Sequence, residues 1–92
     1  MEIIWTSCAL GDLARLYEFL APVNPKAAAA VFEKLTAGPD VLLSQSRIGT
    51  SLPDFLPRQV RYLLVGAYEI RYELTSDDKI WILRLWHTRE DR

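Results

Sequence analysis

The fold is decided by the last third of the chain, which reads RQVRYLLVGAYEIRYELTSDDKIWILRLWH over residues 58–87. This stretch is rich in β-branched and aromatic residues, and turn-forming residues interrupt it only near Gly66 and at residues 76–78. It predicts three strands, at about Arg58–Val65, Ala67–Thr75 and Lys79–His87. Because connections this short join only antiparallel neighbours, we expect the three strands to pair in chain order.

A short strand and a helix are predicted before residue 22. Residues 2–6 alternate and favour a strand, and Ser7 offers an oxygen that can cap the helix that follows. Pro22 ends this helix. Its apolar residues recur at spacings of three and four and so form one stripe, which consists of Leu10, Leu13, Leu16, Tyr17 and Leu20.

A second helix is predicted directly after the first. Asn24 can cap it, and Pro25 suits the first helical position because its missing N–H would have no partner there. The packing face of this helix consists of Val31, Phe32 and Leu35. The short linker between the helices predicts an αα-hairpin. Gly38-Pro39 breaks or kinks the second helix, one or two further helical turns follow, and residues 44–57 form a loop.

The predicted order of elements is β-α-α-β-β-β. It indicates an α+β fold in which a helical hairpin packs on one face of an antiparallel sheet. The 92 residues make one domain, over residues 1–92, because two smaller pieces would bury too little surface to be stable. A hydrophobic content of 50 % and a charged content of 25 % are ordinary for a folded globular protein.

The alternation of side chains along a strand predicts which residues face the helices. On the middle strand these are Tyr68, Ile70, Tyr72 and Leu74, and on the last strand they are Trp81, Leu83 and Leu85. The other face then carries Glu69, Arg71 and Glu73, together with Ile80, Ile82, Arg84 and Trp86. Arg71 would lie near Arg84 if the second turn has two central residues. Arg61 would join them if the first hairpin uses three loop residues.

A row of arginines on one sheet face has two explanations. Each arginine can form a cross-strand salt bridge on a solvated face, which is worth only a few tenths of a kcal/mol. Alternatively the cluster binds something anionic, since neighbouring like charges are otherwise destabilising. The net charge of −1 argues against a general nucleic-acid binder, although seven of the eight arginines lie in residues 46–92. A local basic surface is therefore expected.

Several kinds of chemistry are not expected. His87 is the single histidine and Cys8 the single cysteine, and they lie on different predicted elements, so we predict neither a metal site nor a disulfide. Cys8 is predicted to be a buried small residue. The four scattered glycines form no phosphate-binding loop, and no cofactor is expected. With no signal peptide and no apolar run of roughly 20 residues, we expect a cytoplasmic protein that does not enter a membrane.

The C-terminal residues 87–92 have two readings. They can be a charged, frayed tail, which is the commoner fate of chain ends. They can instead place His87 and Arg89 beside the charged face, where the two residues would serve as acid/base and phosphate clamp in RNA cleavage. The sequence by itself leaves both open.

Short strings spread along the chain carry a resemblance to a known superfamily. They are Trp5, Asp12-Leu13, Tyr17, Asn24-Pro25-Lys26-Ala27-Ala28, Ile48-Gly49, Val60-Arg61-Tyr62-Leu63, Gly66, Tyr68-Glu69-Ile70-Arg71-Tyr72, the segment Ile80–Leu85, His87 and Arg89. In this order and spacing, over nearly its whole length, the chain resembles the ParE/RelE superfamily of type II toxin–antitoxin toxins.

Within this superfamily the chain is more similar to ParE than to RelE. RelE-type ribonucleases carry lysines where this chain has Val60 and Tyr62 or their neighbours, and an arginine where it has Glu69. They also carry a tyrosine beyond the final arginine, whereas nothing aromatic follows Arg89. The ParE resemblance implies a protein that poisons DNA gyrase without catalysis. It also implies a cognate antitoxin whose C-terminal segment lies across the helical hairpin and sheet.

Three functional hypotheses follow. The leading one is a gyrase inhibitor, not an enzyme, that is neutralised by an antitoxin and forms no stable complex with nucleic acid. Its target-binding residues would be Arg61, Arg71, Arg84, Trp86 and Arg89. The second is a ribosome-dependent mRNA endonuclease that uses Arg61, His87 and Arg89. The third is an inactive, toxin-like binding module.

Overall fold

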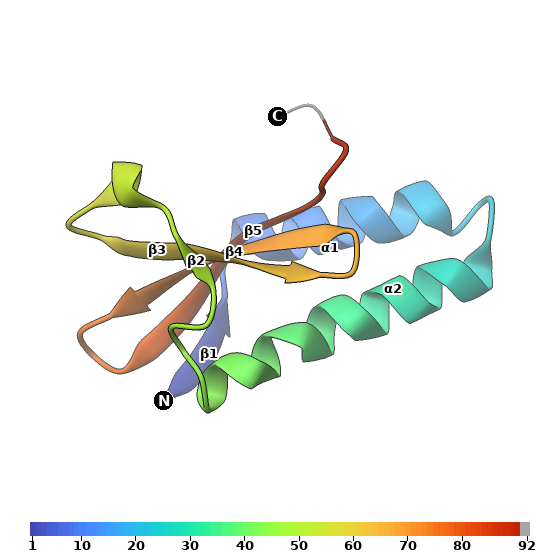
Figure 1. Cartoon of the computed structure of the whole chain (residues 1–92). Coiled ribbons are helices and arrows are strands. Elements are labelled where there is room, and N and C mark those ends of the chain that lie inside the picture. Colours follow the sequence, from blue (N-terminus) through green and yellow to red (C-terminus); the bar gives the residue numbers. More distant parts are fainter. Residues whose placement is uncertain (91–92) are drawn as a thin grey trace.

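The computed structural model describes residues 1–90, which form two α-helices and a five-stranded sheet (Figure 1). The elements are β1 (Glu2–Trp5), α1 (Ser7–Leu20), α2 (Pro25–Ala37), the 3-10 helix η1 (Gly38–Leu43), β2 (Thr50–Ser51), the 3-10 helix η2 (Pro53–Phe55), β3 (Gln59–Val65), β4 (Tyr68–Thr75) and β5 (Lys79–His87). No helix within residues 1–90 is both long and apolar enough to cross a membrane.

The sheet has the strand order β1-β5-β4-β3-β2. Strands β3, β4 and β5 pair antiparallel in chain order, so the predicted meander is confirmed. Strand β1 pairs with β5 in parallel, which makes the sheet mixed rather than antiparallel throughout. Parallel neighbours need a long connection, and here both helices and strands β2, β3 and β4 lie between β1 and β5 in the chain.

The two helices begin and end where local chemistry dictates. The cap of α1 is Thr6 rather than Ser7: its Oγ1 accepts a hydrogen bond of 3.1 Å from the Ala9 N–H. Asn24 caps α2 in the same way, through a 3.1 Å bond from the Ala27 N–H, and Pro25 takes the first helical position as predicted. Helix α2 ends at Ala37, and η1 continues the chain beyond it.

The core lies between the helical hairpin and one face of the sheet. It is formed by Leu13, Leu16, Leu35, Leu42, Ile70, Tyr72, Ile80, Ile82 and Leu85. Helix α1 turns Ala9 and Asp12 toward the sheet, whereas Leu10 and Tyr17 of the predicted stripe are exposed. Phe32 of the predicted α2 face is also exposed. Cys8 is exposed too, so its predicted burial was wrong: it follows the cap residue, on the outer side of the first turn.

A β-bulge in β5 corrects the predicted assignment of its faces. Arg71 lies opposite Arg84 but Tyr72 lies opposite Ile82, so Leu83 is the extra residue. The bulge reverses the alternation, and Ile80, Ile82 and Leu85 are all fully buried on the helix side. The prediction that Trp81 and Leu83 face the helices was therefore wrong for Trp81, which lies opposite Glu73 on the other side.

The loop before β2 is fixed to the sheet by one tyrosine. The hydroxyl of Tyr72 donates to the Ser46 carbonyl at 2.8 Å and accepts from the Gly49 N–H at 3.0 Å. A Cβ on Gly49 would come within 2.5 Å of this hydroxyl, so the close approach requires glycine. The loop therefore has one defined position beside β3.

Candidate functional site: the open face of the sheet

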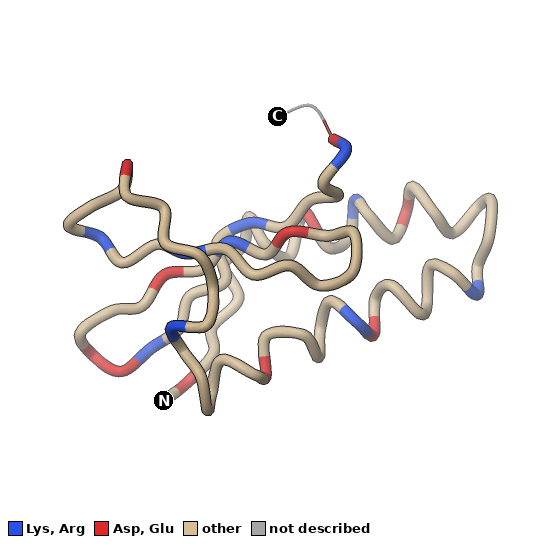
Figure 2. Tube along the Cα trace, in the orientation of Figure 1, with Lys and Arg blue, Asp and Glu red and all other residues tan. Residues whose placement is uncertain are grey.

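The sheet surface that points away from the helices is called the open face here. It carries Val60, Tyr62 and Leu64 from β3, Glu69, Arg71 and Glu73 from β4, and Trp81, Arg84 and Trp86 from β5. Basic positions of neighbouring strands lie close together near the middle of the sheet (Figure 2). Arg71 lies directly opposite Arg84 in register. The predicted neighbourhood is confirmed, although a three-residue turn and the bulge create it.

Arg71 is held between two aromatic rings. Its guanidinium carbon lies 4.8 Å from the ring centroid of Trp86 and 5.3 Å from that of Phe55. Phe55 belongs to η2, so the loop between β2 and β3 folds over the open face. Each such contact is worth about 0.5–1 kcal/mol at an exposed site and more when water is excluded. The two rings hold the guanidinium in place without neutralising it.

Arg84 has a different partner, Asp12 of α1. The Arg84 Nε and Nη2 donate to the two carboxylate oxygens of Asp12 at 2.7 and 3.1 Å. The same carboxylate accepts a 2.9 Å bond from the Leu85 backbone N–H. Asp12 is only 5 % exposed. Burial by itself would raise the pKa of Asp12, but the hydrogen bonds from Arg84 and Leu85 and the charges of Arg84 and Arg15 outweigh it and lower the pKa.

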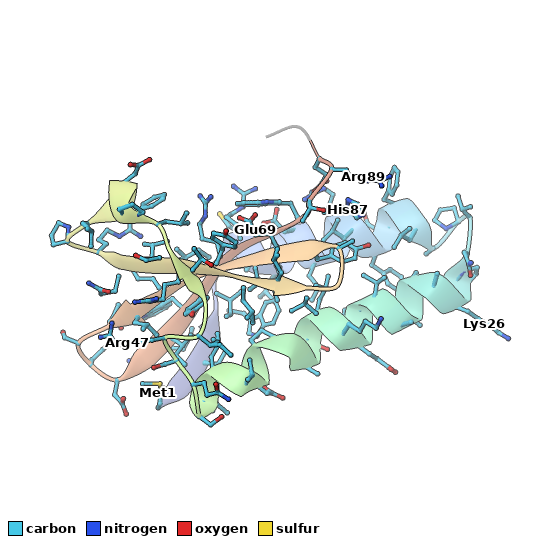
Figure 3. All side chains as sticks on the ribbon, viewed as in Figure 1. Met1, Lys26, Arg47, Glu69, His87 and Arg89 are labelled. Atoms are coloured by element: carbon cyan, nitrogen blue, oxygen red, sulfur yellow. The ribbon has the colours of Figure 1, made fainter. Side chains whose placement is uncertain are left out.

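The carboxylates of the open face lie on either side of Arg71. Glu73 is bound by Arg58, whose Nε and Nη2 reach its two oxygens at 3.1 and 2.7 Å. This partner raises the pKa of Arg58. Glu69, labelled in Figure 3, is 8 % exposed beside Trp86. Arg71 forms no ion pair with any residue of the 1–90 range, and its buried Nε has no hydrogen-bond partner there.

Arg61 does not join the open face. The hairpin from β3 to β4 has two loop residues, with Gly66 at a φ of +59°, and so Arg61 lies opposite Tyr72 on the helix side. Its Nη1 donates to the carbonyl of Gly49 at 2.9 Å and to that of Arg47 at 3.3 Å. Arg61 therefore supports the loop before β2.

His87 and Arg89 also lie away from the open face. His87 is opposite Tyr68, and their rings meet edge to face with centroids 5.1 Å apart. The Arg89 backbone N–H donates to the His87 Nδ1 at 3.0 Å. In Figure 3 both residues are far along the sheet from Arg47, which contacts Arg61. The structure thus does not bring Arg61, His87 and Arg89 together.

The open face carries groups that can bind an anionic partner. Its residues within the described chain are arginines, glutamates, aromatic residues and aliphatic residues, and none is a histidine or cysteine. No group of three His, Cys, Asp or Glu side chains in residues 1–90 could hold a metal ion. A guanidinium flanked by aromatic rings can donate hydrogen bonds to a carboxylate or phosphate of a partner.

Two residues of the site were not predicted. Phe55 lies in a loop between prolines, where an isolated aromatic residue is the available signal. Asp12 resembles an ordinary acidic residue near a helix start, and only its position on the inward face of α1 indicates burial. Of the five predicted target-binding residues, the structure places Arg71, Arg84 and Trp86 on one surface.

Comparison with known proteins first supports the fold and then the family. The structure is similar to a solved structure described as the chromosomal ParDE toxin–antitoxin system from P. aeruginosa, with a TM-score of 0.78, 22 % sequence identity and coverage of 95 % of each chain. At this identity the likeness establishes the fold. No curated protein matches the chain.

The family itself is established from the sequence. Residues 3–92 match the family described as ParE toxin of the type II toxin–antitoxin system, parDE. The chain therefore belongs to the ParE toxin family and is a toxin of a type II toxin–antitoxin system.

Proposed function

We propose that this toxin inhibits DNA gyrase in the cytoplasm and that a cognate antitoxin holds it inactive. The observation that carries the proposal is the match to the ParE family over residues 3–92, since gyrase inhibition and neutralisation by an antitoxin are typical of ParE toxins. The similar solved structure is itself described as a ParDE toxin–antitoxin system. Fold alone would not support a target, because one fold serves many functions.

The geometry of the open face supports a binding mechanism. Arg71 is presented between Phe55 and Trp86 without a carboxylate partner among the described residues. Of the two glutamates of the open face, Glu73 is bound by Arg58 and Glu69 is only 8 % exposed. We therefore assign target contact to Arg71, with the 7 % exposed Trp86 as the ring that supports it and with Arg84 beside them but engaged by Asp12.

The ribonuclease alternative receives less support from the structure. Arg61 lies opposite Tyr72 on β3, whereas His87 lies opposite Tyr68, four residues further along β4. At about 3.3 Å per residue, this offset alone separates them by roughly 13 Å. The Arg61 guanidinium is also held by the carbonyls of Gly49 and Arg47, so it does not point toward His87 and Arg89.

A gyrase assay tests the proposed function directly. Purified toxin should inhibit the supercoiling of relaxed plasmid by gyrase and trap cleaved DNA. Unchanged supercoiling at a large excess of toxin would contradict the proposal. If a translated message is cleaved instead, the ribonuclease hypothesis is correct. If expression without an antitoxin leaves growth unharmed, the chain is an inactive binding module.

One pair of variants tests the assigned surface. Arg71→Glu reverses the charge between the rings and should raise the concentration needed for half-inhibition by about tenfold or more, because central interface arginines often contribute that much. Arg47→Glu makes the same charge change at an exposed residue of the loop before β2, which is not one of the strand residues of the open face. Equal inhibition by both variants would remove Arg71 from the target surface.

A further inference from the structure

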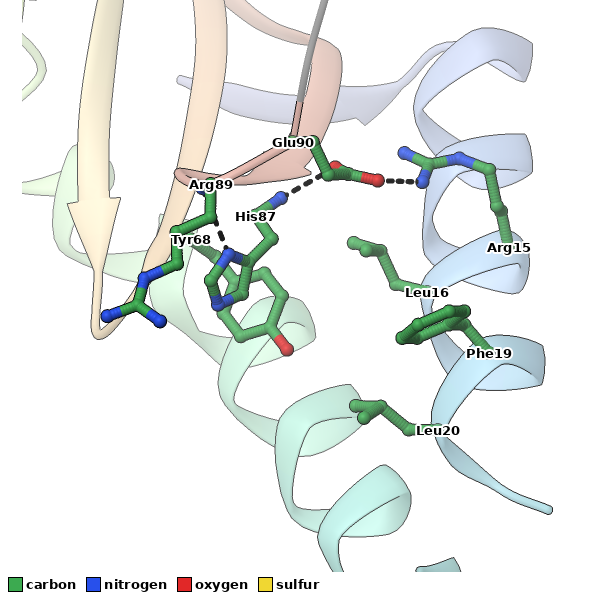
Figure 4. Close-up of a pocket in the computed structure, with 8 residues that line it drawn as sticks. All are labelled: Arg15, Leu16, Phe19, Leu20, Tyr68, His87, Arg89 and Glu90. Atoms are coloured by element: carbon green, nitrogen blue, oxygen red, sulfur yellow. Dashed lines mark hydrogen bonds and ion pairs between the residues drawn. The ribbon is translucent and has the colours of Figure 1, made fainter. Parts of the chain in front are cut away.

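A pocket opens between α1 and the end of the sheet, on the side opposite the open face (Figure 4). Its volume is about 550 Å³. One wall is apolar and consists of Leu16, Phe19 and Leu20 from α1, and the facing wall is the ring pair of Tyr68 and His87. Pockets that receive small molecules have similar volumes and mostly apolar linings. The pocket has room for a large apolar side chain.

The polar groups of the facing wall are hydrogen-bond donors. His87 Nδ1 accepts from the Arg89 N–H, so the neutral ring carries its proton on Nε2. The Tyr68 hydroxyl points toward α1 in Figure 4, and it makes no hydrogen bond to another residue of the 1–90 range. Burial, and then the charge of Glu90, raise the pKa of Tyr68, so this hydroxyl keeps its proton.

The acidic group at the pocket is already engaged. Glu90 forms an ion pair with Arg15 of α1 and accepts a 2.8 Å hydrogen bond from the His87 backbone N–H. Burial alone would raise the pKa of Glu90, but these bonds and the charge of Arg15 lower it. Arg89 lies at the rim and forms no ion pair with any residue in the described part of the chain. The pocket therefore presents the hydrogen-bond donors of Tyr68 and His87 and the positive charge of Arg89, all without a partner among the described residues.

The apolar wall is exposed to an unusual degree. Phe19 is 79 % exposed although it is a large aromatic residue on a regular helix. Exposed apolar surface beside a concave site is typical of protein interaction sites. A partner that covered Phe19 would gain the free energy of removing this surface from water.

We propose that this pocket receives one large apolar side chain, aromatic or branched aliphatic, from an acidic segment of the antitoxin. A neighbouring carboxylate of the same segment accepts hydrogen bonds from Tyr68 and His87 and is attracted by the positive charge of Arg89. The proposal rests on the proposed function in that an antitoxin is taken as the partner. A protein is favoured over RNA because the lining is mainly apolar, and one unpaired arginine matches one carboxylate better than a phosphate at every nucleotide.

A fragment titration tests the chemistry of the pocket without an antitoxin. Indole-3-propionate carries an aromatic ring and a carboxylate, and indole-3-propionamide is its neutral control. The acid should shift the amide NMR signals of Phe19, Leu20, Tyr68, His87 and Arg89, and the amide should bind several-fold more weakly. Absence of localised shifts with millimolar acid would overturn the proposal. Stronger shifts of the same signals by a short single-stranded RNA would overturn it in favour of RNA.

Matched variants then connect the pocket to the antitoxin, for which the probe is the protein encoded by the adjacent reading frame. Phe19→Ser should weaken its binding by about tenfold, as expected for an apolar anchor. Val23→Ser removes a side chain that is 86 % exposed outside the pocket and should change affinity by less than about twofold. Arg89→Gln should weaken binding several-fold, and Arg47→Gln is its control.

The outcomes separate the pocket from the proposed function. Tight antitoxin binding that is unaffected by Phe19→Ser and Arg89→Gln would overturn the pocket assignment and leave neutralisation by the antitoxin intact. Fragment binding at the pocket by a protein that does not inhibit gyrase would refute the proposed target alone. Fragment binding that persists in the complex with the antitoxin would also overturn the pocket assignment.

Discussion

Arg71 of β4 and Arg84 of β5 lie opposite each other in the sheet, but they have different partners. Arg84 reaches a buried carboxylate, Asp12, and ties α1 to the sheet. Within residues 1–90, Arg71 reaches the rings of Phe55 and Trp86 and no carboxylate. The difference arises from position: Arg84 adjoins the bulge, next to the start of α1, whereas Arg71 is on the central strand of the sheet. Arg84 thus stabilises the fold, whereas Arg71 remains available to bind a partner.

The largest expected effect on stability follows removal of Asp12. Asp12→Ala leaves the Leu85 N–H without its acceptor and Arg84 without its bidentate partner. We expect the free energy of unfolding to fall by about 3 kcal/mol, since a buried, multiply bonded carboxylate is lost. Urea unfolding measures it, with the exposed Asp54→Ala as control. A loss of stability no greater than that of the control would show that Asp12 does not stabilise the fold.

A smaller loss is expected from the other partner of this pair. Arg84→Ala leaves Asp12 buried but still bonded to Leu85 and 3.7 Å from Arg15. We expect a destabilisation of about 2 kcal/mol, because the remaining contacts stabilise the carboxylate in part. Thermal unfolding of the single variants and of the double variant with Asp12→Ala measures the coupling. If the two losses of stability simply add, Asp12 and Arg84 do not stabilise the fold as a coupled pair.

The same pair predicts a pH dependence. The pKa of Asp12 is lowered in the folded state, so its contribution is complete above the unfolded value of about 4 and is lost as the pH falls through the folded value. Wild type should therefore lose stability below pH 4 more steeply than Asp12→Asn, which cannot titrate at this position. Unfolding curves collected from pH 6 to 2.5 provide the comparison. Parallel curves for the two proteins would contradict the lowered pKa.

The smallest effect on stability is expected at Arg71. Within the described residues Arg71→Ala removes two contacts with aromatic rings and no ion pair, so the loss should be about 1 kcal/mol, the lower end of what two such contacts contribute. Inhibition of gyrase should nevertheless fall strongly. Chemical unfolding and supercoiling assays on one preparation check both statements. A stability loss as large as that of Arg84→Ala would end the contrast between the two arginines.

Much of the fold could be predicted from local signals. Asn24-Pro25 marked the start of α2, Gly38-Pro39 its end, and the turns near Gly66 and residues 76–78 delimited the three last strands. These signals depend on a few neighbouring residues and not on contacts with distant parts of the chain. The bulge at Leu83 gave no such signal, and it exchanged the faces of the residues before it. Rules of alternation fail wherever one extra residue enters a strand.

The candidate site was only partly predictable for a related reason. Arg71, Arg84 and Trp86 could be assigned to one face from their spacing, but Arg61 depended on a hairpin whose length decided its face. The role of Phe55 depends on how the loop from residue 52 to residue 58 folds back, and nothing in its own neighbourhood indicates that. Contacts between distant segments cannot be read from spacing along one segment.

The amino-acid order by itself determined the α+β class, the helical hairpin, the meander and the membership of the ParE family, because each depends on periodicity, on caps and turns, or on residue strings in order. Tertiary structure alone decided which arginine is neutralised. Asp12 and Arg84 are 72 positions apart, and a charge is compensated by whatever carboxylate folding brings within hydrogen-bond distance. Arg71 contacts aromatic rings instead, and these leave its charge without a carboxylate partner in the described part of the chain.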